Sequence, residues 1–210
     1  NEKVSVSLLE RPQKISMKKG SKSFVGMNDP LIKKNQLKDG TPIDANFYVT
    51  SPHCLEKFNK IFNGGTIWAA GAKTMQVLAK EGFWVNGCAD SMGDGQLVSL
   101  KESKFLSLMM QDLKWKTLTS STGNSTIGEV IPSYEHIINP PSDEYKKIIE
   151  ETETFYWASF FQYQTYLNFF PQIKDRKHCC GLGKTYTAFK EKNIEVTPFL
   201  GPEDFYEQTR

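Results

Sequence analysis

FYVTSPHCLEKFNKIFNGGTIWAAGAKTMQVLAKEG, residues 47–82, alternates twice between an apolar strand pattern and a helical one. It predicts a strand ending at Thr50-Ser51 and a helix to about Phe62, followed by a strand over Thr66–Ala70 and a helix over Gly71–Gly82. Hydroxyl residues and glycine follow both strands. Because parallel strands end at one edge of an α/β sheet, where helix N-termini offer free N–H groups, we expect this edge to bind an anion.

The same plan recurs later in the chain. Phe155–Ser159 repeats the pattern of FYVTS at an offset of 108 (155 − 47), and Lys184-Thr185 repeats Lys73-Thr74 at 111 (184 − 73). At that second offset Asn193 falls on Gly82, and both residue types tolerate the left-handed conformation that ends many helices. Solenoid repeats are several-fold shorter, so the pattern indicates a duplicated domain.

Composition agrees with two small domains in one chain. The sequence has 210 residues, 39 % of them hydrophobic, and a net charge of +2. A nearly balanced charge does not favour a general nucleic-acid binder. There is no apolar run long enough for a membrane helix and no secretory pattern at the start, so we expect a cytoplasmic protein without membrane contact.

Cysteine and histidine give no metal signature. The four cysteines include no CxxC pair, so we interpret them as core thiols in a reducing compartment, with redox chemistry as the competing interpretation. The three histidines are scattered and form no HxxxH pair. We interpret each as a surface or capping residue.

The segments outside the repeat complete the predicted organisation. Strands at Val4–Leu9 and Lys116–Ser120 are followed by connections too brief for an ordinary crossover helix, so these connections should be shortened or unhelical. Two extended segments, about residues 24–35 and 130–140, lie between the halves and predict a two-stranded linker. The remaining predictions are helices over 95–113, 144–151, 160–170 and 185–192, strands over 83–86, 155–157, 178–181 and 194–197, and a tail loop over 201–208.

One motif suggests a different function. Gly181–Thr185, GLGKT, resembles the end of the phosphate-binding loop of nucleotide hydrolases. The complete motif requires glycine five residues before Gly183, and that position is His178. Nucleotide hydrolysis therefore rests on an incomplete motif.

Several motifs in order resemble one enzyme family: TSPHCLEKF, AAGAKTMQVLAKEG, TLTSSTGN, IPSYEHI, FYWASFFQYQTYL, GKTYTAF and NIEV. Together, over Leu8 to Gln208, they resemble uroporphyrinogen-III synthase, a cofactor-free enzyme of tetrapyrrole synthesis. The resemblance implies an α/β fold of two similar doubly wound parallel-sheet domains joined by the two-stranded linker. Domain one would be residues 1–32 and 139–210, and domain two residues 33–138.

The resemblance also implies a reaction. The family closes linear hydroxymethylbilane with loss of water and inversion of ring D, so the partner would be a small-molecule tetrapyrrole, with no metal or cofactor. We expect a monomer. The substrate is intrinsically reactive, so the protein must mainly hold one conformation of a polycarboxylate. The competing function is an inactive relative that binds an anionic ligand with the same helix ends.

Motif matching assigns the site residues. Tyr134, in IPSYEHI, is the candidate acid for the leaving hydroxyl, and Arg11 could pair with a substrate carboxylate. Helix capping is the competing interpretation for each Ser and Thr. The implied substrate-binding residues are Thr50, Ser51, Gly71, Lys73, Thr74, Gly123 and Asn124 in domain two, and Ser159, Gly183, Lys184 and Thr185 facing them from domain one.

Overall fold

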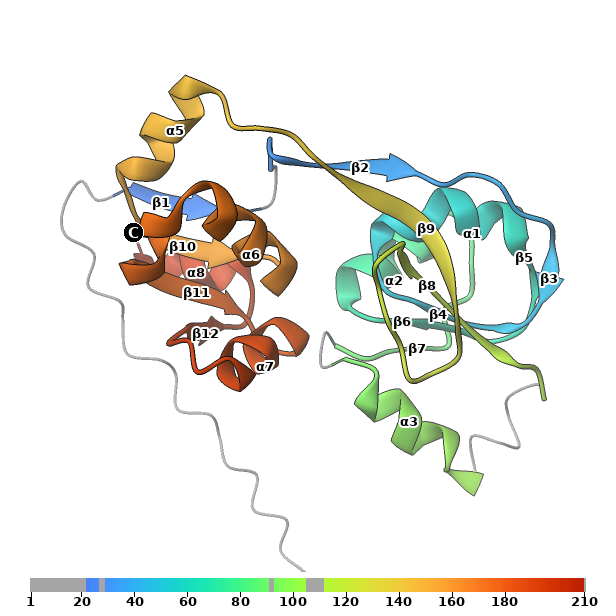
Figure 1. The fold of residues 1–210 in the computed structure, drawn as a ribbon. Coiled ribbons are helices and arrows are strands. Elements are labelled where there is room, and N and C mark those ends of the chain that lie inside the picture. The colour runs from blue at the N-terminus through green and yellow to red at the C-terminus, as the bar shows by residue number, and fades with distance from the viewer. Residues whose placement is uncertain (1–21, 27–28, 91–92, 105–111, 210) are drawn as a thin grey trace, which may run out of the picture. The chain divides into compact units, whose positions relative to one another are not determined.

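The structure is a computed structural model that describes residues 22–26, 29–90, 93–104 and 112–209 (Figure 1). It is a mixed α/β protein with parallel sheets. Contacts divide the chain into two compact units, unit 1 (Asn1–Asn28 and Asp143–Arg210) and unit 2 (Asp29–Ser142). The predicted boundaries at 32/33 and 138/139 lie four residues away from these divisions, which fall at 28/29 and 142/143.

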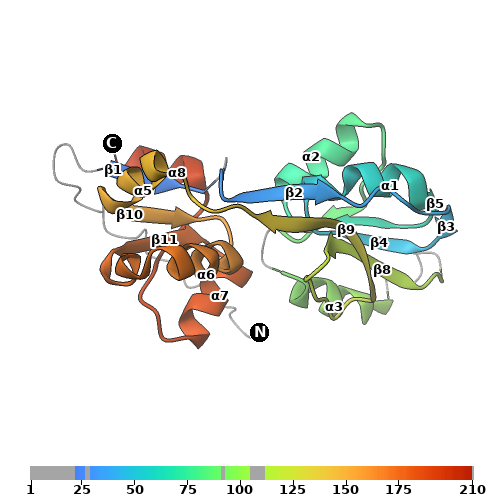
Figure 2. The same cartoon turned by 45° about the horizontal axis from the view of Figure 1, so that its top comes forward.

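Unit 2 is built on a six-stranded sheet in the order β2-β9-β8-β4-β6-β7. All neighbouring strands in it are parallel except β2 and β9, which are antiparallel and lie side by side (Figures 1 and 2). The chain leaves β4 toward β6 on one side, while β8 lies on the other side of β4. This reversal of strand order marks the carboxyl ends of β4 and β8 as the usual ligand position in open α/β sheets. The strands are β2 (Ile32–Gln36), β4 (Asn46–Val49), β6 (Ile67–Ala69), β7 (Gly87–Cys88), β8 (Trp115–Ser120) and β9 (Glu129–Ile138).

Helices cover both faces of this sheet. Successive side chains of β4 point to opposite faces, and all of them are buried, so each face needs a covering layer. Phe47 and Val49 pack under η1 (Pro52–Cys54), α1 (Leu55–Ile61) and α2 (Ala72–Lys80), in a core with Phe58, Ile61 and Leu78. Tyr48 points to the opposite face and packs with Leu97 of α3 (Gly95–Lys101). A small parallel pair, β3 (Ile43–Asp44) and β5 (Phe62–Gly64), completes the unit.

The connection between the parallel strands β8 and β9 contains no helix, which confirms the prediction for this half. Lys116 lies opposite Glu129, so residues 121–128 return along the length of β8. Asp94 fixes this returning segment. Its Oδ2 accepts one hydrogen bond from the backbone N–H of Thr126 (3.1 Å) and another from the Thr126 hydroxyl (3.3 Å). The corresponding connection near the N-terminus lies outside the described residues.

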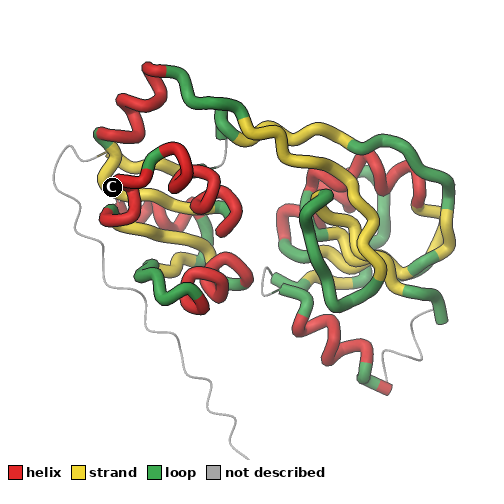
Figure 3. Tube along the Cα trace, in the orientation of Figure 1, coloured by secondary structure: helices red, strands yellow, loops and turns green. Residues whose placement is uncertain are grey.

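Unit 1 has a fully parallel four-stranded sheet in the order β1-β10-β11-β12, with helices packed around it (Figure 3). Its strands are β1 (Lys22–Val25), β10 (Thr152–Trp157), β11 (Lys177–Gly181) and β12 (Thr197–Phe199). Its helices are α5 (Asp143–Glu150), α6 (Phe160–Phe169), η2 (Pro171–Asp175), α7 (Lys184–Glu191) and α8 (Pro202–Thr209).

His178 lies in the aromatic core of unit 1 and is only 5 % exposed, so its interpretation as a surface or capping residue is wrong. Helices cover the face of β11 on which it lies. Its Nδ1 accepts a hydrogen bond from Trp157 Nε1 (3.1 Å), and its ring contacts Tyr163 (5.1 Å between centroids) and Phe189 (6.2 Å). Burial lowers the pKa of His178, so the neutral imidazole is the form that the core accommodates.

Two side-chain hydrogen bonds hold the start of α6. Ser159 Oγ accepts a hydrogen bond from the backbone N–H of Gln162 (3.2 Å), and Gln162 Oε1 accepts one from the backbone N–H of Ala158 (3.1 Å). Gln162 is 3 % exposed, and its Nε2 also donates to the carbonyl of Gly26 (3.2 Å). A Cβ at Gly26 would lie 2.2 Å from the Gln162 amide, so a larger residue where the chain leaves β1 would displace that amide.

The ends of α2 and α7 confirm the predicted repeat. Gly82 has φ 90° and Asn193 has φ 55°, both in the left-handed region. Phe83 N donates to Leu78 O (3.2 Å), and Ile194 N donates to Phe189 O in the same way (3.0 Å). These bonds define the same Schellman ending at equivalent positions of the two halves.

Several predicted elements differ from the observed ones. Residues 22–25 form β1, inside the sheet of unit 1 rather than in a linker, and the strand beside β9 is β2. Residues 202–209 form α8 instead of a tail loop, because Phe205 packs on Tyr156 of the sheet. The first part of the helix predicted over 95–113 is α3, which ends at Lys101, and residues 105–111 lie outside the described residues. The strands predicted at 83–86 and 194–197 occur slightly later, as β7 and β12. Val4–Leu9 lies outside the described residues.

None of the helices in the described ranges is long and apolar enough to cross a membrane.

Candidate functional site

The candidate site lies at the carboxyl ends of β4 and β8 in unit 2. Both the backbone N–H of Thr50 and its hydroxyl donate to the carbonyl of Leu118 (3.0 and 2.9 Å), so this threonine fixes β4 against β8. The next residue, Ser51, is the N-cap of η1, and its Oγ accepts a hydrogen bond from His53 N (3.3 Å). Thr50 therefore has a structural role, while the Ser51 hydroxyl lies at the edge of the site.

A β-bulge places Tyr134 at this edge. Thr119 pairs with Pro132 and Ser120 with Tyr134, so Ser133 is an extra residue in β9. Pro132 has no N–H to give to a sheet ladder, and proline in a sheet is expected at a bulge or an edge. Beyond the bulge, β9 pairs with β2, and Tyr134 lies opposite Gln36. The bulge thus marks the point where β9 changes its partner strand.

Basic side chains from four elements lie beside Tyr134 or beside one another. Lys34 on β2 lies opposite His136 on β9, and its Nζ is 3.0 Å from His53 Nε2 on η1. The Tyr134 ring is in edge contact with the rings of His53 (5.6 Å between centroids) and His136 (5.4 Å). Lys73, in the first turn of α2, adds a fourth basic group. We call Lys34, His53, Lys73 and His136 the basic cluster.

Burial and neighbouring positive charges lower the pKa values of both histidines of the basic cluster. Burial lowers the pKa of His53 most, and the charges of Lys34 and Lys73 lower it further, followed by that of His136. Burial and then Lys34 lower the pKa of His136. These shifts keep both imidazoles neutral at neutral pH.

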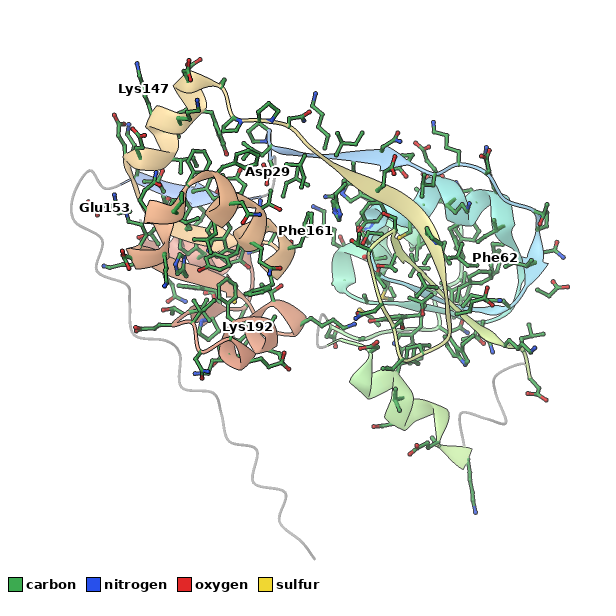
Figure 4. All side chains as sticks on the ribbon, viewed as in Figure 1. Asp29, Phe62, Lys147, Glu153, Phe161 and Lys192 are labelled. Carbon is green, nitrogen blue, oxygen red and sulfur yellow. The ribbon has the colours of Figure 1, made fainter. Side chains whose placement is uncertain are left out.

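Lys34 is subject to the same repulsion. Desolvation lowers its pKa first, the carboxylate of Asp29 opposes this, and Lys73 lowers it again. Asp29, labelled in Figure 4, stands just before β2, and its Oδ1 accepts a hydrogen bond from Leu31 N (2.8 Å). Lys34 is nevertheless partly open to solvent, so an anion from outside can reach its ammonium group.

Tyr134 supplies a neutral hydroxyl beside the cluster. It is 8 % exposed, and desolvation raises its pKa, with a further increase from Cys54 and an opposing effect of the hydrogen bond with Ser51. The phenol is therefore protonated at neutral pH. A protonated phenol beside cationic and imidazole groups can give a proton to a leaving oxygen and hold a nearby carboxylate.

The other predicted residues of unit 2 have different environments. Gly71 is the N-cap of α2, and Lys73 is exposed, as expected for ligand contacts. Thr74 is only 4 % exposed and belongs to the buried residues of α2, and its contact with ligand stays a prediction. Gly123 lies in the turn after β8, where a Cβ would be 2.5 Å from Thr119, and Asn124 beside it is exposed.

In unit 1 the predicted residues lie at two helix starts. Ser159 is the N-cap of α6, so it has the helix-capping role that competes with substrate binding as an interpretation of this residue. Gly183 caps α7 with φ 104°, a conformation that favours glycine. Lys184 is exposed and Thr185 is half-buried. Arg11 lies outside the described residues.

Sequence reasoning missed Lys34, His53 and His136 as site residues. Tyr134 and His136 are two apart on a strand and so share a face, which the sequence could have revealed. Lys34 had no such signal, because only the register between β2 and β9 brings it opposite His136. Within the described ranges, no group of three or more His, Cys, Asp or Glu side chains could hold a metal ion.

Comparison with known proteins finds likeness in structure and none in sequence. No protein-family model matches this sequence, and no curated protein matches it. The structure is similar to that of uroporphyrinogen-III synthetase from Helicobacter pylori 26695, with a TM-score of 0.57 and 13 % identity over 89 % of this chain and 97 % of that chain. Uroporphyrinogen III synthase from Thermus thermophilus aligns over 82 % of this chain and 87 % of that chain at 13 % identity, with a TM-score of 0.35. The first likeness establishes a shared fold.

Proposed function

We propose that this protein is a uroporphyrinogen-III synthase, a lyase that closes hydroxymethylbilane with loss of water and inversion of ring D. The fold it shares with a uroporphyrinogen-III synthetase supports this reaction class. The observation that carries the proposal is the position of Tyr134, a protonated phenol at the ligand edge of the sheet and in contact with two imidazoles. That site suits an acid-assisted reaction of a polycarboxylate.

Tyr134 would act as the general acid. The bond between the terminal methylene carbon and its hydroxyl breaks as the phenol gives its proton to that oxygen, and water leaves. The resulting azafulvene is attacked by the substituted carbon of ring D, and the spiro intermediate opens and closes again with the ring inverted. The phenolate can take back the proton that the inverted pyrrole ring loses when it regains its aromaticity after ring closure. The phenol assists chemical steps and not substrate binding, so its expected effect is on turnover.

Binding is divided among several groups in this proposal. In unit 2 the Ser51 hydroxyl, the N-terminus of α2 at Gly71 and the ammonium group of Lys73 are placed to meet carboxylates. Gly123 and Asn124, in the turn after β8, are further proposed contacts, and Thr50 orients the edge that carries them. In unit 1 the proposed substrate contacts are Ser159, Gly183, Lys184 and Thr185.

The direct test is product analysis. Purified protein is mixed with freshly made hydroxymethylbilane, and the products are oxidised and separated into type I and type III isomers. We expect the type III isomer to dominate, at a rate proportional to protein concentration, while a protein-free sample gives type I. Type I product alone at high protein concentration would reject the synthase and leave the inactive anion-binding relative, which the basic cluster also supports.

A further inference from the structure

The basic cluster brings two lysines and two histidines together at one edge of the sheet. The charged and titratable groups that act on it are Lys34, Asp29, His53, Cys54, Lys73, Tyr134 and His136. Asp29 is the acidic residue that acts on Lys34, and it lies at the far end of β2 from the bulge. Gathering four basic groups costs electrostatic energy, which an anion bound among them would recover.

The geometry fits a carboxylate. Lys34 and His53 already share a hydrogen bond of 3.0 Å, and His136 is directly across the strand pair from Lys34. Side chains directly opposite in an antiparallel pair have Cβ atoms about 5 Å apart. Three donors at such spacing can surround the two oxygens of one carboxylate. His53 is exposed and His136 half-buried, so a ligand can reach them.

We propose that Lys34, His53 and His136 form a subsite for one carboxylate of the ligand, and that the two imidazoles take up protons when it is filled. This proposal rests on the proposed function in one respect, the identity of the molecule that carries the carboxylate. In the empty site Lys34 donates its hydrogen bond to neutral His53. When a carboxylate binds, Lys34 turns to it, and His53 and His136 each gain a proton from solvent and donate an N–H.

Proton uptake gives this subsite a signature that simple charge attraction lacks. A bound carboxylate favours the charged imidazoles, so the pKa values of both should rise toward or above their ordinary value near 6.5. Binding should therefore be tightest at mildly acidic pH. It should weaken as pH rises through the imidazole pKa values of the complex, because the bound state then loses those protons.

The experiment follows histidine by proton NMR. The chain has three histidines, so the imidazole signals can be assigned with His53→Gln and His136→Gln. The probe is mellitate, a benzene ring with six carboxylates. Saturating mellitate should raise the titration midpoints of His53 and His136 by on the order of half a pH unit or more. The midpoint of His178, enclosed in the core of unit 1, should stay where it is and serves as the internal reference.

A matched pair of lysine variants tests the subsite separately from net charge. Lys34→Met should weaken mellitate binding roughly tenfold, the value of one charge-assisted hydrogen bond. Lys33→Met removes the same charge from the adjacent position of β2, which points to the other face, and should change affinity by less than about twofold. Circular dichroism checks that both variants fold.

The outcomes separate this proposal from the proposed function. If mellitate moves neither histidine midpoint, or if both lysine variants weaken binding equally, the subsite is wrong even when the protein makes type III product. If the midpoints move and Lys34→Met alone weakens binding, the subsite stands even when no type III product forms.

Discussion

Tyr134→Phe is the variant that bears most directly on the proposed chemistry. It removes one hydroxyl and keeps the ring that contacts His53 and His136. The structural loss is the hydrogen bond with Ser51, about 0.5–1.5 kcal/mol of unfolding free energy. A general acid contributes roughly 10²–10⁴ in rate, equal to about 2.7–5.5 kcal/mol of activation free energy. The loss of turnover should therefore exceed the loss of stability.

The assay measures kcat and KM for type III product, alongside urea denaturation. We expect kcat to fall by two orders of magnitude or more, with KM within about threefold. Tyr48→Phe is the matched control, because Tyr48 lies on the opposite face of the same sheet, 1 % exposed and packed with Leu97. Its kcat should stay within about twofold of the parent. A kcat for Tyr134→Phe as high as that control would remove the phenol from the acid role.

Three further predictions concern the fold that supports the site. Gln162→Ala should lower the unfolding free energy by about 2–4 kcal/mol, because buried backbone groups lose their partners, whereas Gln164→Ala on the exposed side of α6 should cost less than about 0.5 kcal/mol in the same urea titration. Burial lowers the pKa of folded His178, so the unfolded chain binds the extra proton first. The unfolding free energy should be constant above about pH 6.5 and fall as the pH drops below that value. His178→Phe should make this fall shallower, as measured by urea titrations at several pH values. Gly183→Ala should cost about 1–3 kcal/mol because its φ of 104° strains any other residue, while Gly95→Ala, where an added Cβ meets nothing within 4 Å, should be nearly neutral in thermal unfolding.

Local patterns in the sequence predicted most of the repeated architecture. The strand and helix periods of residues 47–82 gave β4, α1, β6 and α2 in order, and the helix ends at Gly82 and Asn193 have the same hydrogen bonds. These features depend on residues within one or two turns of each other, so propensity and capping suffice to predict them. The tail helix α8 was missed because its apolar contact, Phe205 on Tyr156, joins distant parts of the chain.

The site residues also divide into those that the sequence identified and those whose environment depends on tertiary packing. Ser51 and Tyr134 were identified by their motifs, and the structure brings them into hydrogen-bond reach. Thr74 was chosen from the same helix start, yet its side chain turns into the core, which its position in the sequence did not show. Whether a side chain in the first turn of a helix points to the core or to solvent depends on how the helix packs on the sheet.

The amino-acid sequence by itself determined the duplicated strand–helix pattern and the glycine and asparagine helix ends. The choice of Tyr134 as the candidate acid came from the resemblance to the synthase family and stays a prediction. Only the tertiary structure decided that His53 and His136 contact the Tyr134 ring and that Lys34 joins them. Lys34 and His136 are 102 residues apart (136 − 34), and they meet because β2 and β9 pair in one register, starting where a bulge at Ser133 frees β9 from β8. A register is set by hydrogen bonds and packing along the whole strand pair, so a shift of one residue would turn these side chains to the other face.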